Sequence, residues 1–177
     1  RKMLKFSTNL TAEAVGLAAS GAGSLEGSAA VMTSWAQRRF GIAAVFGDHS
    51  GLGPKSRIAP AEMLAVMLKA RTSPTGALLE GLLRDMGLPG ADGKAQEKAA
   101  VRVRAKSGTM NFLSNLSGYV VAKDGRRLAF AVFTADLPRR AAVPVEQRED
   151  PEGDAAWVKR ARRLHGQLLH RWAGMYL

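Results

Sequence analysis

The chain has 177 residues, of which 46% are hydrophobic and 23% are charged, so it is long enough for one domain and has the composition of a globular protein. It contains no cysteine, which excludes disulfides, thiolate metal sites and a cysteine nucleophile, and no apolar run approaches the roughly 20 residues of a transmembrane segment. The net charge of +11 allows a polyanionic partner, but the basic residues are scattered and no zinc-finger or RNA-recognition motif occurs, so we favour a solvated basic surface and expect no nucleic-acid partner.

The first half of the chain carries helical patterns. Residues 11–20 predict a short helix rich in small residues, and residues 29–41 predict a second helix that ends at a glycine. Residues 43–58 are a short apolar run followed by a loop rich in glycine, serine and proline. A proline at position 60 fits the first turn of a third helix over residues 60–70, and residues 76–87 predict a fourth, short helix.

Strand patterns dominate after a predicted polar loop over residues 88–100. Apolar and basic residues alternate over 101–106, which predicts a strand with one apolar and one cationic face. Two further strands, 117–122 and 127–135, flank the sequence Lys-Asp-Gly-Arg, and Asp-Gly between apolar runs is a strong hairpin signal. A long loop over 137–154 and an amphipathic terminal helix from residue 155 complete an α+β order, with helices packed on an antiparallel sheet of three strands.

Most polar clusters in the sequence do not suggest chemistry. His165 and His170 are five residues apart on the terminal helix, so they do not share one face, and we expect structural or solvated roles. The string Asp48-His49-Ser50 resembles a catalytic triad in composition, but triad residues converge from distant parts of a chain. No His, Asp or Glu cluster has the spacing of metal ligands, so we expect no metal and no cofactor.

Two stretches remain as candidates. In "FSTNL", Ser7 and Asn9 stand two residues apart, and on its own this pattern predicts the amino-terminal cap of a helix. In "AKSGT", Lys106 stands at the end of the cationic-faced strand and is followed by Ser-Gly-Thr, which on its own predicts a turn with a solvated lysine. The glycine adds a second possibility, because glycine within a strand often marks a close approach of a ligand to the backbone.

Taken together, the two stretches resemble the second and third signatures of the serine penicillin-recognising enzymes, Ser-x-Asn and Lys-Ser/Thr-Gly. Three blocks resemble the D-alanyl-D-alanine carboxypeptidase/endopeptidase family, the class C low-molecular-mass penicillin-binding proteins. They are "RKMLKFSTNLTAEAVGL", "DHSGLGPKSRIAPAEML" and "VRVRAKSGTMNFLSNLSGYVVAKDGRRLAFAVFTADL". The resemblance covers residues 1 to about 137 and implies a transpeptidase-like domain of the penicillin-binding protein and β-lactamase type.

The sequence departs from the family in one large respect. The family's first signature is Ser-x-x-Lys, which carries the nucleophile, and no serine in this chain has a lysine three residues later. We therefore expect residues 1–177 to be the carboxy-terminal portion of a single transpeptidase-like domain. A missing amino-terminal segment then supplies the nucleophile and two more strands, and the chain is inactive alone. Smaller departures are serine for threonine at Ser107 and histidine for glycine at His49.

The resemblance implies acyl transfer by a serine that attacks the bond between two D-alanines of a peptidoglycan stem peptide, with β-lactams as inhibitors. It implies a periplasmic location. It also assigns Ser7, Asn9 and Lys106 to catalysis: Asn9 holds the substrate amide, and Ser7 bridges the lysine and the leaving nitrogen.

The resemblance also implies a substrate-binding strand. Lys106, Ser107 and Thr109 bind the terminal carboxylate, and the Thr109 N–H helps to hold the oxyanion. Gly108 lets the substrate backbone approach, and Asn111 lines a neighbouring pocket. Two alternatives stay open: a non-catalytic module that binds peptidoglycan or another polyanion, and, ranked last, a basic nucleic-acid-binding domain.

Overall fold

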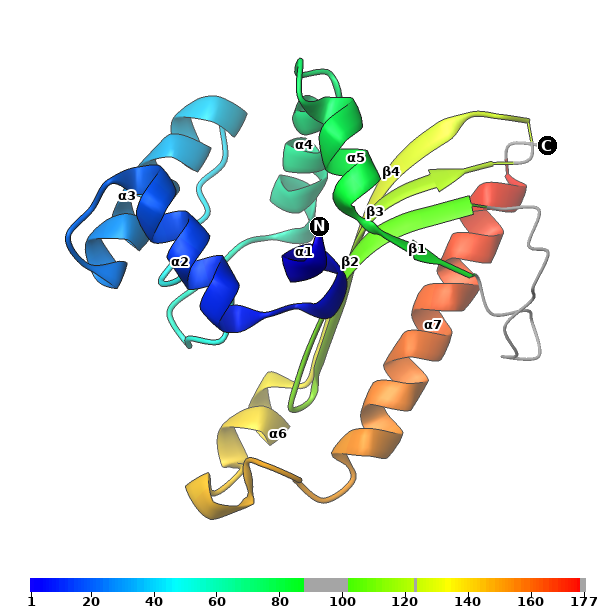
Figure 1. The fold of residues 1–177 in the computed structure, drawn as a ribbon. Coiled ribbons are helices and arrows are strands. Elements are labelled where there is room, and N and C mark those ends of the chain that lie inside the picture. Colours follow the sequence, from blue (N-terminus) through cyan, green and yellow to red (C-terminus); the bar gives the residue numbers. More distant parts are fainter. Residues whose placement is uncertain (88–101, 123, 176–177) are drawn as a thin grey trace. The chain divides into compact units, whose positions relative to one another are not determined.

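A computed structural model of the protein describes residues 1–87, 102–122 and 124–175 (Figure 1). The chain forms two compact units, Arg1–Arg84 and Asp85–Leu177. The elements are, in chain order, α1 (Lys2–Phe6), α2 (Asn9–Ser20), α3 (Leu25–Phe40), α4 (Pro60–Arg71), α5 (Gly76–Leu82), β1 (Arg84–Met86), β2 (Arg102–Met110), β3 (Leu113–Val121), β4 (Arg127–Ala135), α6 (Leu137–Ala142), a 3-10 turn (Val145–Gln147) and α7 (Asp154–Gly174).

The first unit contains the helices predicted from the first half of the sequence. Its core lies where α3 and α4 pack against the extended segment between them, and the buried members are Ala36, Phe40, Ile42 and Ala44. Helix α3 starts four residues earlier than predicted, at Leu25, because the Ser24 hydroxyl accepts a hydrogen bond from the Gly27 N–H (3.1 Å) and caps the helix.

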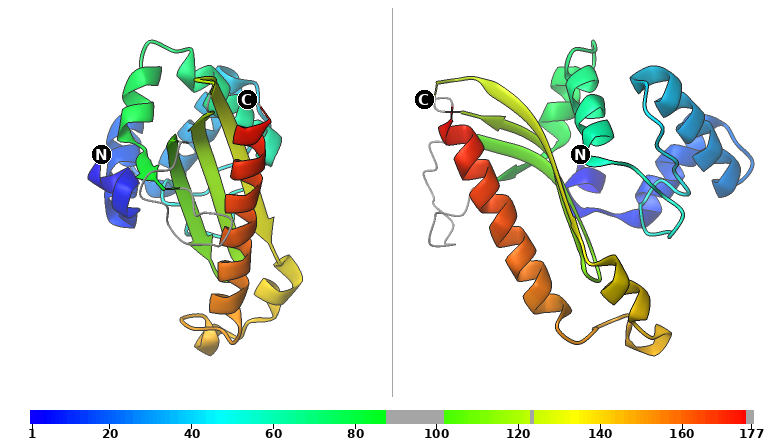
Figure 2. Two further views of the ribbon diagram at one scale, coloured as in Figure 1. Left: turned by 90° about the vertical axis from the view of Figure 1, so that its right-hand side faces the viewer. Right: turned by 180° about the vertical axis from the view of Figure 1, so that it is seen from behind.

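The second unit is an antiparallel sheet with α7 on one face. The strand order is β1-β2-β3-β4, with β2 and β4 both antiparallel to β3. Figure 2 shows α7 running along this face of the sheet. Apolar side chains of the strands and of α7 form the core between them, and the buried members are Val103, Ala105, Leu116, Val120, Phe130, Val132, Leu169 and Ala173. The α+β fold predicted from the sequence is confirmed.

Two predictions about the strands were wrong. The described sheet has four strands rather than three, because residues 84–86 of the predicted fourth helix form β1: Leu83 has an extended backbone (φ −66°, ψ 156°) that ends α5. The strand predicted over residues 101–106 also does not end at Lys106. β2 continues to Met110 in register with β3, since the ladder of backbone hydrogen bonds outweighs the low strand propensity of Ser-Gly.

The turn between β2 and β3 is fixed by a buried aromatic ring. Phe112 is 1% exposed and has a positive φ of 51°. Its N–H donates to the Asp154 carboxylate (2.6 Å) at the start of α7, and its ring packs edge-on against Trp157. This turn therefore ties the β2–β3 hairpin to the first turn of α7.

The predicted Asp-Gly hairpin is present between β3 and β4. Gly125 has φ +83°, and the Asp124 carboxylate accepts a hydrogen bond from the Arg126 N–H (2.9 Å). Val101, the loop over residues 88–100 and Lys123 lie outside the described residues. The predicted loop over 137–154 contains α6, whose first turn is capped by Asp136.

None of the helices in the described ranges combines the length and apolar character that a membrane span requires.

Candidate functional site

The Lys-Ser-Gly-Thr tetrapeptide lies inside β2, on a strand with an open edge. Val103 and Ala105 of β2 are each 1% exposed and belong to the core under α7. Because successive positions of a strand face opposite sides of the sheet, the Lys106 side chain and position 108 lie on the face away from this core. β1 has only three residues, whereas β2 has nine. Most of the outer edge of β2 therefore has no ladder partner among the described strands, and an unpaired strand edge is the kind of surface that an extended peptide can join.

Lys106 is held close to the strand. Its side chain is half-buried, and its Nζ donates a hydrogen bond to the carbonyl oxygen of Ser107. Burial lowers the pKa of Lys106 below its usual value. The ammonium is thus oriented along the tetrapeptide rather than extended into solvent.

Gly108 leaves room on the strand face that it shares with Lys106. A Cβ at this position would meet, as its nearest described neighbour, the Cβ of Asn115 at 4.0 Å. Packing among the described residues therefore does not require glycine here, although glycine in a strand weakens it. The side-chain oxygen of the adjacent Asn115 is buried and accepts no hydrogen bond from the described residues.

Thr109 contacts a residue that the sequence did not single out. The Nη2 of Arg162 on α7 donates a hydrogen bond to the Thr109 hydroxyl (3.2 Å), and both residues are exposed. The two positions are 53 residues apart in sequence, and no local motif relates them. Only the packing of α7 on the sheet brings Arg162 to the tetrapeptide.

Asn111 lies in the turn after β2. Its side-chain amide donates to the carbonyl oxygen of Arg148 (2.7 Å), and its own carbonyl accepts from Arg140 (2.9 Å). These bonds anchor the segment between α6 and α7. A role for Asn111 in lining a substrate pocket stays a prediction.

Ser7 and Asn9 lie at the junction of α1 and α2 in the first unit. Ser7 is the C-cap of α1 and has a left-handed backbone (φ 54°, ψ 48°), and Asn9 is the first residue of α2. The stretch does contain the N-cap of α2, as its residues alone predict, but the N-cap residue is Thr8, and its side chain makes no capping hydrogen bond. Left-handed residues other than glycine cost free energy and cluster at functional sites.

The predicted site residues thus fall into two groups. Ser7 and Asn9 belong to the first unit, and Lys106, Ser107, Gly108 and Thr109 belong to one strand of the second. The structure brings the four strand residues together. That Ser7 and Asn9 face the four strand residues across one substrate-binding groove stays a prediction.

His49 has a structural role in the first unit. Its Nε2 lies 2.7 Å from the Oγ of Ser28, which is fully buried, and its ring fills the space that a Cβ at Gly16 would need (2.2 Å). The Glu13 carboxylate accepts hydrogen bonds from the His49 and Ser50 N–H groups. The pKa of Glu13 is lowered, mainly by a hydrogen bond from the Ser50 side chain and further by these backbone hydrogen bonds.

Asp48 does not orient this imidazole. Its carboxylate accepts hydrogen bonds from the Gly51 N–H (2.7 Å) and the Gly53 N–H (2.5 Å). Residues 48–53 therefore form a loop that is pinned to α2 and α3, without a catalytic triad. Glu13 and Ser28, which do the pinning, were not identified from the sequence.

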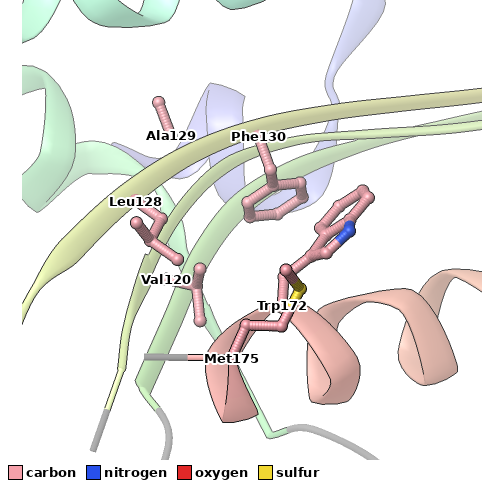
Figure 3. Close-up of a pocket in the computed structure, with 6 residues that line it drawn as sticks. All are labelled: Val120, Leu128, Ala129, Phe130, Trp172 and Met175. Carbon is pink, nitrogen blue, oxygen red and sulfur yellow. The ribbon is translucent and has the colours of Figure 1, made fainter. Parts of the chain in front are cut away.

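An apolar pocket lies elsewhere in the second unit (Figure 3). It has a volume of about 250 Å³ and is lined by Val120, Leu128, Ala129, Phe130, Trp172 and Met175. Its lining contains no titratable side chain, so it offers no group for catalysis. In the described ranges, no group of three or more His, Asp or Glu side chains is placed to hold a metal ion.

The profile of the D-Ala-D-Ala carboxypeptidase 3 (S13) family matches residues 1–159 of the chain. None of the curated proteins compared matches it. Similar solved structures include penicillin-binding protein 4 of Haemophilus influenzae (23% identity, TM-score 0.65), covering 95% of this chain and 38% of that protein. The same protein with a β-lactam has 22% identity and a TM-score of 0.67, with 95% and 40% covered.

A predatory endopeptidase of Bdellovibrio bacteriovorus, solved with its immunity protein, has 17% identity and a TM-score of 0.65, with 96% of this chain and 42% of that one covered. At these identities the likeness establishes the fold. The chain spans about two fifths of the length of the structures that it matches.

Proposed function

Because the chain belongs to the D-Ala-D-Ala carboxypeptidase 3 (S13) family, we propose that it is the carboxy-terminal part of a serine D-Ala-D-Ala carboxypeptidase or endopeptidase that acts on peptidoglycan stem peptides. The observation that carries the proposal is the position of Lys-Ser-Gly-Thr on the open edge of β2. A peptide that pairs with a strand edge lies in the plane of the sheet, so side chains from both faces can reach it.

In this proposal, β2 binds the carboxy-terminal end of the substrate. The Lys106 ammonium and the hydroxyls of Ser107 and Thr109 bind the terminal carboxylate through charge-assisted hydrogen bonds. Gly108 lets the substrate backbone lie against the strand, and the space beside it supports this role. The Thr109 N–H donates to the oxyanion that develops during acyl transfer.

Ser7 and Asn9 complete the site from the first unit. Asn9 holds the substrate amide, and Ser7 passes a proton between Lys106 and the leaving nitrogen. The left-handed backbone of Ser7 supports a functional role, because strained backbone conformations of this kind cluster at active sites and ligand-binding sites.

The nucleophile comes from a segment outside residues 1–177. None of the serines in the chain is followed by lysine three residues later, so we propose that an upstream Ser-x-x-Lys supplies the serine that forms the acyl-enzyme and that β-lactams acylate. Both units then belong to one transpeptidase-like domain in the periplasm. The chain alone hydrolyses nothing.

The experiment uses the complete gene product and a pentapeptide that ends in D-Ala-D-Ala. We expect release of D-alanine, and we expect loss of this release when the upstream Ser-x-x-Lys serine is changed to alanine. A complete protein that releases no D-alanine, or one that is unaffected by the serine change, overturns the proposal.

A further inference from the structure

We propose that Arg162 on α7 is a positioning residue for Thr109, and that it raises the affinity of the β2 edge for the terminal carboxylate of the substrate. This inference rests on the proposed function and adds to it a residue outside the three family signatures. It is carried by the hydrogen bond from Arg162 Nη2 to the Thr109 hydroxyl (3.2 Å) and by the polar contacts that hold α7 in place beside it.

A row of polar side chains crosses the sheet beside Thr109. Thr109 pairs with Ser114 of β3, and Ser114 pairs with Thr134 of β4. On the same face, the core residues of β2 and β3 are Val103, Ala105, Leu116 and Val120. The polar row therefore marks one end of the interface between α7 and the sheet.

His165 fixes α7 to this row. Its side chain is 3% exposed, and its Nε2 lies 3.1 Å from the Thr134 hydroxyl. That hydroxyl donates its single hydrogen to the Ser114 carbonyl (2.6 Å). Nε2 must therefore carry the proton and donate to Thr134. Because Arg162 precedes His165 by less than one helical turn, this bond also sets where Arg162 stands.

The direction of the Arg162 bond suits a carboxylate site. A hydroxyl has one hydrogen to donate and two lone pairs to accept with. The Thr109 hydroxyl oxygen accepts the hydrogen bond from Arg162 with one of its lone pairs, so its hydrogen stays available for a carboxylate oxygen. A cationic donor also polarises the hydroxyl and strengthens the hydrogen bond that it gives.

Among the residues that the structure describes, no acidic side chain forms an ion pair with Arg162. The ion pairs among the described residues join Lys55 to Glu26, Arg104 to Asp85 and Arg126 to Asp124. The guanidinium thus adds a positive charge within hydrogen-bonding distance of the proposed carboxylate ligand Thr109. Arg163, the next residue on α7, is also exposed and forms no hydrogen bond to Thr109 in the structure, so it serves as a matched control.

The test compares steady-state kinetics of the complete gene product with Arg162→Ala, Arg162→Lys and Arg163→Ala, using a peptide that ends in D-Ala-D-Ala. We expect Arg162→Ala to raise KM about tenfold with kcat within about threefold, as for the loss of one charge-assisted contact. Arg162→Lys restores part of the KM, and Arg163→Ala behaves as the wild type. Thermal unfolding of each variant checks that the fold is kept.

A double-mutant cycle with Thr109→Val separates positioning from a general charge effect. If Arg162 acts through Thr109, adding Arg162→Ala to Thr109→Val raises KM by less than it does in the wild type. If the wild-type protein releases D-alanine but Arg162→Ala and Arg163→Ala have equal KM values, the inference is overturned and the proposed function stands. A wild-type protein that releases no D-alanine overturns the proposed function instead.

Discussion

Gly108 and Gly118 lie on neighbouring strands of one antiparallel pair, but packing requires only one of them. A Cβ at Gly118 would lie 2.1 Å from the Arg104 carbonyl oxygen and 2.7 Å from the Ala105 Cα, whereas a Cβ at Gly108 would meet Asn115 Cβ at 4.0 Å. Gly118 therefore serves the fold of the sheet. Gly108 keeps open a strand face that carries Lys106.

The two glycines should respond differently to alanine. Gly118→Ala forces backbone apart and is expected to destabilise the protein by several kcal/mol or prevent folding. Gly108→Ala is expected to keep the melting temperature within a few degrees and to lower kcat/KM for a D-Ala-D-Ala peptide about tenfold or more, because the added methyl group projects onto the sheet face of Lys106, beside the proposed ligand. Thermal unfolding and peptide hydrolysis measure the two effects. A Gly108→Ala variant with full activity would remove this face from the site.

Lys106 is expected to matter far more than an exposed lysine. In the complete gene product, Lys106→Ala should lower kcat/KM about 100-fold or more, since in the proposed function Lys106 is both a carboxylate ligand and a group in the proton path. Lys159→Ala, on the exposed side of α7, is the control and should leave the rate unchanged. Equal rates for the two variants would exclude Lys106 from the site.

A substitution at Ser7 is expected to change the activity without lowering the stability. Its left-handed backbone favours glycine, so Ser7→Gly is expected to leave the free energy of unfolding unchanged or to raise it by up to about 1 kcal/mol. The loss of the hydroxyl is expected to lower kcat at least tenfold. Urea unfolding and hydrolysis rates test both parts, and an unchanged kcat contradicts the role proposed for Ser7.

His165 predicts a dependence of stability on pH. Burial, and then the charge of Arg162, lower the pKa of His165 in the folded protein, so the unfolded chain binds a proton more readily. Its contribution to stability is therefore present above the unfolded pKa of about 6.5 and is lost as the pH falls through the lowered folded pKa. His165→Gln keeps a donor for Thr134 and should flatten this part of the profile. Parallel profiles of unfolding free energy for both proteins below pH 7 would refute the prediction.

Local sequence patterns predicted the elements that depend on near neighbours. The alternation before Lys106 predicted the buried face of β2, which Val103 and Ala105 form, and Asp-Gly predicted the turn at Gly125. The pattern of residues 76–87 was misleading, because the extended backbone at Leu83 ends the helix and residues 84–86 join the sheet. Pairing with another strand is a tertiary effect that a helical pattern does not report.

Sequence motifs nominated most of the candidate site residues, whose roles stay predictions. The tetrapeptide at Lys106 and the pair Ser7 and Asn9 were visible as signatures in the sequence. Arg162 was not, because its contact with Thr109 depends on how α7 packs on the sheet. The role of His49 was also hidden, since its partners on α2 and α3 are Gly16 and Ser28.

The most direct measurement is the mapping of a fluorescent penicillin adduct by mass spectrometry, on the complete gene product and on residues 1–177 alone. The account predicts one adduct on the complete protein, at the serine of a Ser-x-x-Lys upstream of this chain, and no labelling of residues 1–177 alone. An adduct on any serine within residues 1–177, or a complete protein that takes no label, would contradict it.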